Sequence, residues 1–265
     1  MGVLNVSPDS FSDGGLHTDA DSAVRAGILM LESGADWIDV GGESTRPGSL
    51  PVEAGEQIRR IAPVVAGLAR AGGGAVISID TSQAAVAQAA LDAGASVLND
   101  VTAGRGDAEM FSLAVRFKAP IVLMHMQGTP RTMQEAPVYS DVVAEVIGFL
   151  RSRAEAAVAA GIEPSRVLVD PGIGFGKTVD HNLQLLRGLG ELAACGWPVV
   201  VGTSRKGFIR AVTGEIEPSQ RLMGTAASVA WSAANGAAVV RVHDVEPMAR
   251  VVRMIRSIQL GRVCD

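Results

Sequence analysis

The chain has 265 residues, of which 48% are hydrophobic and 19% charged, and its formal net charge is −5. This charge argues against nucleic acid or an anionic membrane as the main partner, and no apolar run reaches the ~18 residues of a membrane span. The first residues lack the pattern of a secretory signal, and Cys195 and Cys264 have neither metal-site nor disulfide spacing. We therefore expect a cytoplasmic protein.

Short apolar runs alternate along the chain with longer segments of helical periodicity. Residues 140–161 have apolar positions at i, i+3 and i+4 and end at Gly161, and Gly34, Gly94 and Gly196 predict the ends of other helices. The apolar runs predict strands at residues 2–6, 37–40, 75–80, 96–100, 121–125, 167–170, 199–202 and 239–243.

Eight such strand–helix units are typical of a (β/α)₈ TIM barrel, which we predict as a single domain over residues 1–265. A doubly wound open sheet is the alternative, because periodicity does not show whether a sheet closes. In a barrel, the groups that act on a substrate lie where the strands end. Polar residues occupy these predicted ends, at Asn5, 41–48, Asp80, Asn99, His125, Asp170, 204–206 and 241–244.

One group of polar residues suits a planar nitrogen heterocycle. Its members are two carboxylates, an amide and a cation: Asp80, Asp170, Asn99 and Lys206. Carboxylate and amide groups can pair with adjacent N–H groups, as on a guanidine-like aminopyrimidinone, in the way a carboxylate pairs with arginine. Lys206 would contact a ring nitrogen or carbonyl. The alternative is that each aspartate caps the helix that follows it.

A second group suits phosphate. Arginine binds phosphate oxygens bidentately and histidine can add a hydrogen bond or a proton, which makes Asn5, Arg46, Arg241 and His243 candidates. Arg241 and His243 alternate along a predicted strand and should point to one face. The competing explanation is a surface ion pair between Arg241 and Asp244. Asn5 would hold Mg²⁺ only together with water and substrate phosphate oxygens.

Two segments, 5–15 and 41–49, have the small, polar, Gly- and Pro-rich composition of a closing lid, although plain surface turns share it. In the first, Asp13 would supply charge and Phe11 would cover an aromatic ligand. We interpret His125 as a core histidine bonded to the backbone and Glu43 as a carboxylate that fixes its loop.

The glycines of "GIGFG" (172–176) occur at every second position, which is not the order of a dinucleotide fingerprint. Lys177, which follows them directly, has no contact that the sequence assigns.

The motifs "MGVLNVSPDSFSDGG", "DVGGESTRPG", "SIDT", "LMHMQG", "DPGIGFGKT", "SRK" and "RVHDV" occur in this order. Together they closely resemble the dihydropteroate synthase family, the sulfonamide target of folate biosynthesis, from residue 1 to about residue 255. The resemblance implies a TIM barrel, a homodimer and Mg²⁺. It also implies condensation of 6-hydroxymethyl-7,8-dihydropterin diphosphate with p-aminobenzoate, which yields 7,8-dihydropteroate and pyrophosphate.

The resemblance assigns a role to each motif residue. It implies pterin contacts from Asp80, Asn99, Met124, Asp170, Phe175, Gly202 and Lys206. It implies diphosphate contacts from Asn5, Arg46, Arg241 and His243, with Asn5 also on the metal, and a p-aminobenzoate site bordered by Phe11, Thr45, Pro47, Phe175 and Ser204. The residues expected to act in catalysis are Asp13, Asp80, Lys206, Arg241 and His243.

A dissociative route follows from the charges: two carboxylates would stabilise a pterin cation while Mg²⁺ and the arginines stabilise the departing pyrophosphate. We expect no covalent enzyme intermediate, and ordinary sulfonamide sensitivity because "DSFSDGG" carries no inserted residue. Family members usually carry a strand or arm before "MGVLN", so we expect a thinner plug at the bottom of the barrel. The alternatives are a pterin-binding methyltransferase and an inactive pterin-binding paralogue.

Overall fold

The computed structural model describes residues 1–6, 16–43, 52–71, 74–129 and 132–264, without the side chains of residues 16–19. In this part of the chain, eight strands form one sheet in the order of the sequence, each parallel to the next. They are β1 (Gly2–Asn5), β2 (Trp37–Gly41), β3 (Val76–Asp80), β4 (Val97–Asp100), β5 (Ile121–Met124), β6 (Val167–Asp170), β7 (Val199–Val201) and β8 (Ala237–Val240).

The sheet closes on itself between β8 and β1. A parallel bridge joins Gly2 to Val242, Val3 N donates to Val242 O over 3.0 Å, and Val242 N donates to Met1 O over 2.9 Å. The fold is therefore the predicted (β/α)₈ TIM barrel, and the alternative of an open sheet is excluded.

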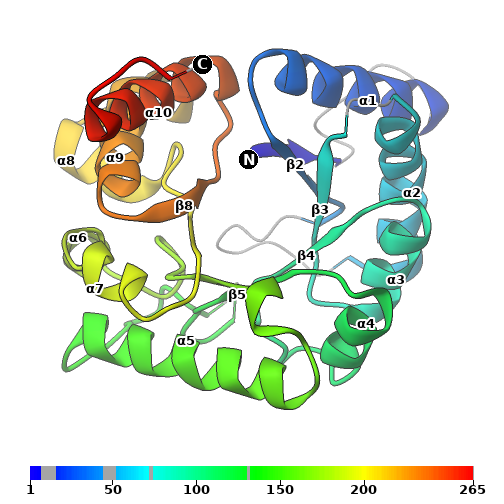
Figure 1. The fold of residues 1–265 in the computed structure, drawn as a ribbon, viewed down its shortest axis with the longest axis horizontal. Coiled ribbons are helices and arrows are strands. Elements are labelled where there is room, and N and C mark those ends of the chain that lie inside the picture. Colours follow the sequence, from blue (N-terminus) through cyan, green and yellow to red (C-terminus); the bar gives the residue numbers. More distant parts are fainter. Residues whose placement is uncertain (7–15, 44–51, 72–73, 130–131, 265) are drawn as a thin grey trace.

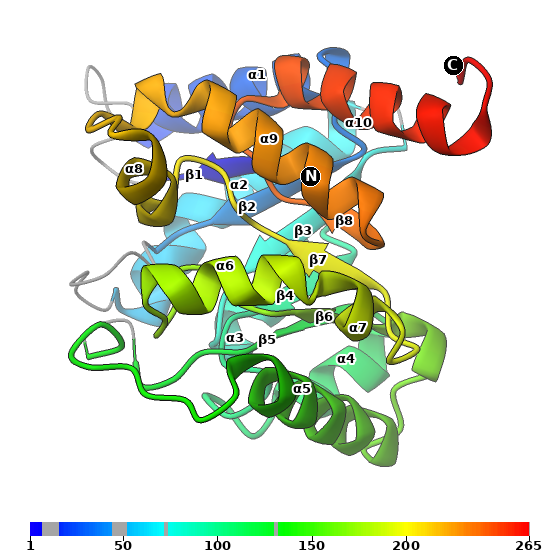
Figure 2. The ribbon, with the colours of Figure 1, turned by 90° about the vertical axis from the view of Figure 1, so that its left-hand side faces the viewer.

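Helices surround the ring of strands, and α5 and α10 lie on opposite sides of it in both ribbon views (Figures 1 and 2). The helices described are α1 (Leu16–Glu32), α2 (Ala54–Ala71), α3 (Ala84–Asp92), α4 (Met110–Phe117), α5 (Val142–Ala159), α6 (Val179–Arg187), α7 (Leu189–Ala193), α8 (Gly207–Thr213), α9 (Leu222–Ala234) and α10 (Val245–Leu260), with short 3₁₀ turns η2 (Pro164–Arg166) and η3 (Pro218–Gln220). None of these helices has the length and apolar character needed to cross a membrane.

Local chemistry explains where the longest predicted helix begins and ends. Asp141 accepts hydrogen bonds from the N–H groups of Val143 and Ala144, which caps the start of α5. Gly161, two residues after its end, has a φ of 104°, a conformation that glycine adopts without steric cost. The helix expected over 140–161 is therefore confirmed with a slightly shorter span.

Seven of the predicted strands agree with the structure to within one residue at each end, whereas the last differs. We expect it over 239–243, but β8 covers Ala237–Val240, and beyond it Val242 forms an isolated bridge with Gly2. The backbone N–H of Arg241 still donates to Val201 O over 2.9 Å. Arg241 thus stays attached to the barrel wall just beyond the regular strand.

Side chains that point into the barrel form two levels of different character. The lower level is apolar and packs as one cluster of Val97, Val122, Leu168 and Val200 with Trp37, Val76 and Val239. Because alternate residues of a strand share a face, the residues two positions further along form the next level. These are Asp39, Ser78, Asn99, Met124, Asp170, Gly202 and Arg241. The barrel interior therefore has an apolar layer beneath a polar layer, and the polar layer lies at the C-terminal ends of the strands.

Candidate functional site

A cavity of about 890 Å³ opens at the C-terminal ends of the strands. It brings together residues from β1, β3 and the segments after β6, β7 and β8, in agreement with the predicted position of the site. Among the predicted residues, its walls contain Asn5, Asp80, Phe175, Ser204, Lys206, Arg241 and His243.

The other predicted pterin contacts belong to the polar level of the barrel interior. Asn99, Met124 and Asp170 lie at the ends of neighbouring strands and are each less than a tenth exposed. Gly202 follows β7, and a Cβ placed on it would lie 3.7 Å from both Lys206 Nζ and Arg241 Cβ. It therefore borders two residues of the cavity wall. The predictions for Phe11, Asp13, Thr45, Arg46 and Pro47 fall outside the described residues.

Arg241 forms a buried double ion pair. Its Nε donates to Asp39 Oδ2 over 2.7 Å and its Nη2 donates to Asp80 Oδ2 over 2.9 Å. These two carboxylates hold the pKa of Arg241 above its usual range even though burial opposes this. The competing interpretation, a surface pair with Asp244, is wrong, because Asp244 pairs with Arg205.

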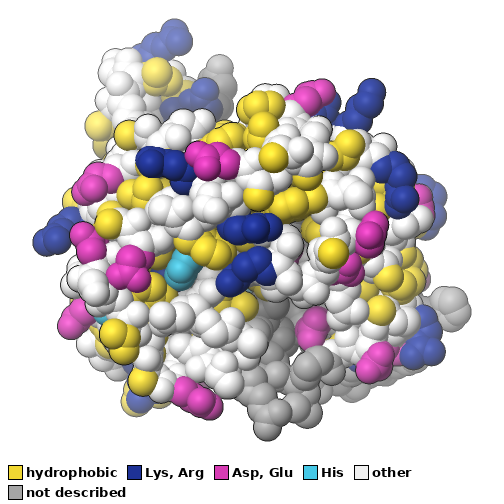
Figure 3. All heavy atoms as spheres, turned by 90° about the horizontal axis from the view of Figure 1, so that it is seen from below, with side chains coloured by type: hydrophobic (Ala, Val, Ile, Leu, Met, Phe, Trp, Pro, Cys, Tyr) yellow, Lys and Arg dark blue, Asp and Glu magenta, His cyan; other side chains and the backbone are white. Residues whose placement is uncertain are grey.

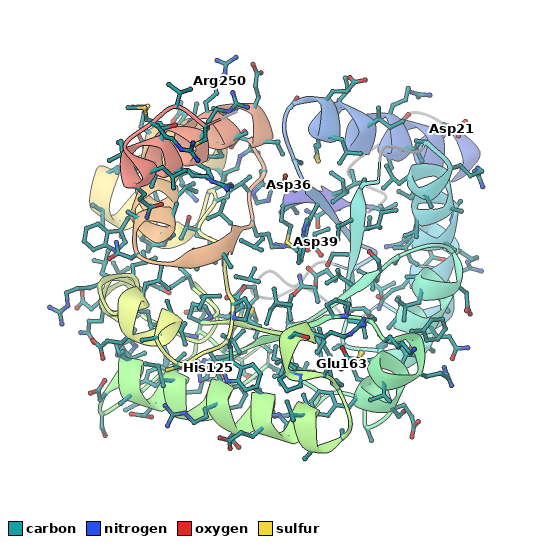
Figure 4. All side chains as sticks on the ribbon, in the orientation of Figure 1. Asp21, Asp36, Asp39, His125, Glu163 and Arg250 are labelled. Atoms are coloured by element: carbon teal, nitrogen blue, oxygen red, sulfur yellow. The ribbon has the colours of Figure 1, made fainter. Side chains whose placement is uncertain are left out.

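Asp39 is a site residue that the sequence analysis missed. It is fully buried in β2, and it accepts hydrogen bonds from Asn99 Nδ2 over 3.0 Å and from Arg241. Figure 4 shows it inside the ring of strands. The detectable signal was an acidic residue at an inward-facing strand position, between Trp37 and Gly41. Asp39 thus binds both the amide of Asn99 in β4 and the guanidinium of Arg241, which follows β8.

Asp80 presents an unsatisfied carboxylate oxygen in the cavity wall. Its Oδ2 is bonded to Arg241, whereas its Oδ1 is buried without a hydrogen-bond partner. Burial raises the pKa of Asp80 to about 7; Arg241 opposes this shift and Asp39 adds to it. A buried, unpaired acceptor is costly, so a ligand that brings an N–H group or positive charge to Oδ1 would be bound favourably.

Asp170 fixes the turn that follows β6 and does not cap a helix. Its Oδ1 accepts the N–H of Gly172 over 2.6 Å, which is a turn contact rather than a helix cap. Burial raises the pKa of Asp170, although Lys206 and the Gly172 N–H both oppose the shift. The carboxylate is therefore poorly solvated and stands to gain from a donor ligand.

Lys206 stands between Asp170 and the loop that follows β6. Its Nζ donates to Ile173 O and lies 4.8 Å from the ring centroid of Phe175, in a cation–π arrangement. Burial lowers the pKa of Lys206 to about 8, and Asp170 opposes this change. A cation is thereby held beside an aromatic face in the cavity wall.

Glycines shape the loop that follows β6. Gly172, Gly174 and Gly176 have φ values of 65°, 83° and 62°. At Gly172 an added Cβ would lie 1.9 Å from the backbone oxygen of His125, so only glycine fits there. These residues turn the chain back over residues 125–127, the segment that follows β5.

His243, which follows β8, and Ser204, which follows β7, contact each other in the cavity wall. His243 Nδ1 lies 3.0 Å from Ser204 Oγ, and the backbone N–H of His243 donates to the same oxygen over 3.2 Å.

Glu43 accepts hydrogen bonds from Val52 N over 3.1 Å and Gln57 Nε2 over 3.0 Å. The prediction that Glu43 fixes its loop is confirmed.

His125 and Lys177 form a buried contact beside the cavity. His125 is buried, as predicted, and its ring nitrogen Nδ1 lies 2.9 Å from Lys177 Nζ. Burial and the nearby lysine lower the pKa of His125 to about 3, and burial lowers the pKa of Lys177 to about 7. Figure 4 shows His125 on the side of the barrel next to α5.

A divalent cation would have few protein ligands here. Among the described residues, no three His, Cys, Asp or Glu side chains form a metal-binding group. The partly exposed Asn5 Oδ1 lies 3.6 Å from the position of a Cβ on Gly41, and Asp80 Cβ lies at the same distance. One amide beside a carboxylate fits Mg²⁺, which keeps several water ligands and binds substrate phosphates.

Comparisons with known proteins support the resemblance. A family model described as pterin binding enzyme matches residues 1–243. The dihydropteroate synthase of Synechocystis sp. is 42% identical over 254 residues, which cover 96% of this chain and 88% of the relative. The chain belongs to the pterin-binding enzymes. Within this family, the relatives named here are dihydropteroate synthases, which are transferases.

Two solved structures agree with this family assignment. The Yersinia pestis dihydropteroate synthase with a sulfonamide drug complex has a TM-score of 0.91 and 40% identity, over 99% of this chain and 94% of that one. The Xanthomonas albilineans dihydropteroate synthase in complex with 7,8-dihydropteroate has a TM-score of 0.88 and 42% identity, over 98% and 92%. The predicted membership is therefore confirmed over nearly the whole chain.

Proposed function

We propose that this protein is a dihydropteroate synthase that joins 6-hydroxymethyl-7,8-dihydropterin diphosphate to p-aminobenzoate and releases pyrophosphate. The observation that carries the proposal is a cavity whose wall contains the carboxylate Asp80 and the cations Lys206 and Arg241, with the carboxylate of Asp170 buried beside Lys206 in the barrel interior. Burial raises the pKa of both carboxyl groups. Relatives with this activity support it, including a structure with the product 7,8-dihydropteroate.

The pterin ring would bind in the interior of the barrel. Asp170 would accept the amino and N3 protons, Asn99 would take the neighbouring nitrogens and Asp80 would face N8. Lys206 would contact N5 and O4, and the apolar surface would come from Met124, Phe175 and Gly202. Asp39 restrains Asn99 through its amide N–H, so the amide of Asn99 is already oriented before a ligand binds.

The diphosphate would extend toward Asn5, Arg46, Arg241 and His243. The bonds of Arg241 to Asp39 and Asp80 engage Nε and Nη2, and a guanidinium carries five N–H donors, so it can also bind phosphate oxygens. The p-aminobenzoate would lie beyond the pterin, bordered by Phe175 and Ser204. Phe11, Thr45 and Pro47 would complete this outer site.

Charge determines the expected course of the reaction. Loss of pyrophosphate leaves a pterin cation, which Asp80 and Asp170 would stabilise together with Asp39 behind them. The aromatic amine would then attack without a strong base, while Lys206 would hold the ring and His243 the leaving group. The role proposed for Asp13 is to supply charge at this step. We expect no covalent intermediate; isolation of a pterin bonded to a side chain would contradict this route.

Mg²⁺ would be held by Asn5 with water and phosphate oxygens, and it would supply positive charge to the leaving pyrophosphate. We also propose that the protein acts as a homodimer in the cytoplasm and that sulfonamides compete with p-aminobenzoate. A structure of a relative with a sulfonamide drug complex supports the last point. On the face drawn in Figure 3, acidic and basic side chains are interspersed.

The test is direct detection of the product. Purified protein incubated with both substrates and Mg²⁺ should form 7,8-dihydropteroate, measured by mass spectrometry. A pterin-binding methyltransferase would instead transfer the methyl group of a methylated folate to a corrinoid. That result, with no dihydropteroate formed, would overturn the proposal.

A further inference from the structure

Lys177 is buried in the wall of the cavity, 3% exposed, and no role in the proposed reaction uses it. Its Nζ donates to Phe175 O over 2.9 Å and to His125 O over 3.4 Å, and it lies 2.9 Å from His125 Nδ1. Below its pKa of about 7, Lys177 carries an ammonium group, which has three N–H donors. Each of them therefore has an acceptor, and the amine is directed at the protein rather than at a substrate.

The state of His125 agrees with this arrangement. Burial holds its imidazole neutral, with a pKa of about 3, so Nδ1 can accept a hydrogen bond from Lys177 Nζ while Nε2 carries the ring hydrogen. The ring is fixed from another side by Phe149, whose centroid lies 4.9 Å away in an edge-on arrangement. Lys177 is thus anchored to a rigid acceptor at the end of β5.

The same lysine holds the loop that carries Phe175. Other side chains bind the neighbouring carbonyls of this loop: Lys206 binds Ile173 O, Gln134 binds Gly174 O over 2.9 Å and Tyr139 binds Gly176 O over 2.8 Å. Phe175 O is bound by Lys177, which ties it to β5. The ring of Phe175 in turn lies against Lys206.

We propose that Lys177 is a positioning residue, which fixes Phe175 between the pterin and p-aminobenzoate sites by bonding its carbonyl to the end of β5. This rests on the proposed function, because Phe175 borders both substrates only in that reaction. Without the amino group of Lys177, the acceptors His125 Nδ1, His125 O and Phe175 O lose this donor. The aromatic ring would then lose its fixed orientation and p-aminobenzoate would bind less tightly.

The test is a double-substitution cycle with steady-state kinetics. Lys177→Met should raise the KM for p-aminobenzoate about tenfold, the effect of losing one hydrogen bond to a charged group of ~1.5 kcal/mol. In a Phe175→Ala background the same substitution should change this KM less than about twofold. Lys118→Met, at an exposed lysine on the opposite end of the barrel, is the matched control and should leave KM unchanged.

A merely structural role gives a different pattern. An equal factor in both backgrounds, or a lower kcat at unchanged KM, would overturn the proposal. If Lys177→Met fails to fold, Lys177→Gln keeps two donors and should show the same dependence on Phe175 with a smaller effect. If the wild-type protein forms no dihydropteroate, the proposed function is contradicted rather than the role of Lys177. The same wild-type, single and double variants are then compared by their affinity for 6-hydroxymethylpterin.

Discussion

Replacement of Asp170 by asparagine separates its two contacts. Asparagine retains a side-chain oxygen that can accept the Gly172 N–H, which the carboxylate binds over 2.6 Å, so the turn after β6 should persist. What is lost is the negative charge and one acceptor toward the ligand. Because a hydrogen bond to a charged group contributes about 1.5–3 kcal/mol, affinity for the pterin should fall by roughly 10- to 150-fold.

Calorimetric titration with 6-hydroxymethylpterin measures this effect, since the ligand lacks the diphosphate and does not involve the phosphate-binding groups. Asp141→Asn is the matched control, because Asp141 caps α5 and asparagine caps helices about equally well. It should leave pterin affinity and the free energy of unfolding nearly unchanged. An Asp170→Asn variant with wild-type affinity would refute the assignment of Asp170 as the pterin anchor.

Three further predictions concern neighbouring residues. Asp80 acts as the carboxylate and has a pKa of about 7, so kcat/KM for the pterin diphosphate should rise as the pH increases through 7. Asp80→Asn should lower kcat/KM and remove this rise from the pH profile. A rise that persists in the variant would assign the titration to another group. His243→Ala should weaken binding of the pterin diphosphate about tenfold but not that of 6-hydroxymethylpterin, and equal losses for both ligands would contradict a phosphate contact. Gly172→Ala should lower the free energy of unfolding, measured in urea, by at least ~2 kcal/mol, because the added Cβ would meet a backbone oxygen at positive φ. At Gly190 an added Cβ has open space, so Gly190→Ala should not lower this free energy. Similar values for the two variants would contradict the packing account.

The sequence was sufficient to predict the barrel and the level at which its chemistry lies. Apolar strands alternate with helical segments, and the polar residue at each strand end is visible directly, as at Asp80, Asn99 and Asp170. The end of β8 was misplaced because it depends on pairing between strands, which periodicity within one strand does not contain: past Val240, Val242 forms an isolated bridge with Gly2.

Partnerships between distant residues could not be predicted. Arg241 and Asp39 are 202 positions apart, and their pairing depends on closure of the barrel, which brings β8 next to β1 and places β2 one strand further. Asp244, which is close to Arg241 in sequence, pairs with Arg205 instead. Lys177 and His125 are 52 positions apart and meet only because the glycines let the β6 loop fold back over β5.

Pyrophosphate release is the measurement that tests the proposed function most directly. With 6-hydroxymethyl-7,8-dihydropterin diphosphate, p-aminobenzoate and Mg²⁺ present, the protein should release one pyrophosphate for each dihydropteroate formed. Sulfonamides should inhibit the reaction in competition with p-aminobenzoate. Stoichiometric binding of the pterin diphosphate without catalytic release of pyrophosphate would contradict the proposed function and identify a pterin-binding protein that lacks the activity.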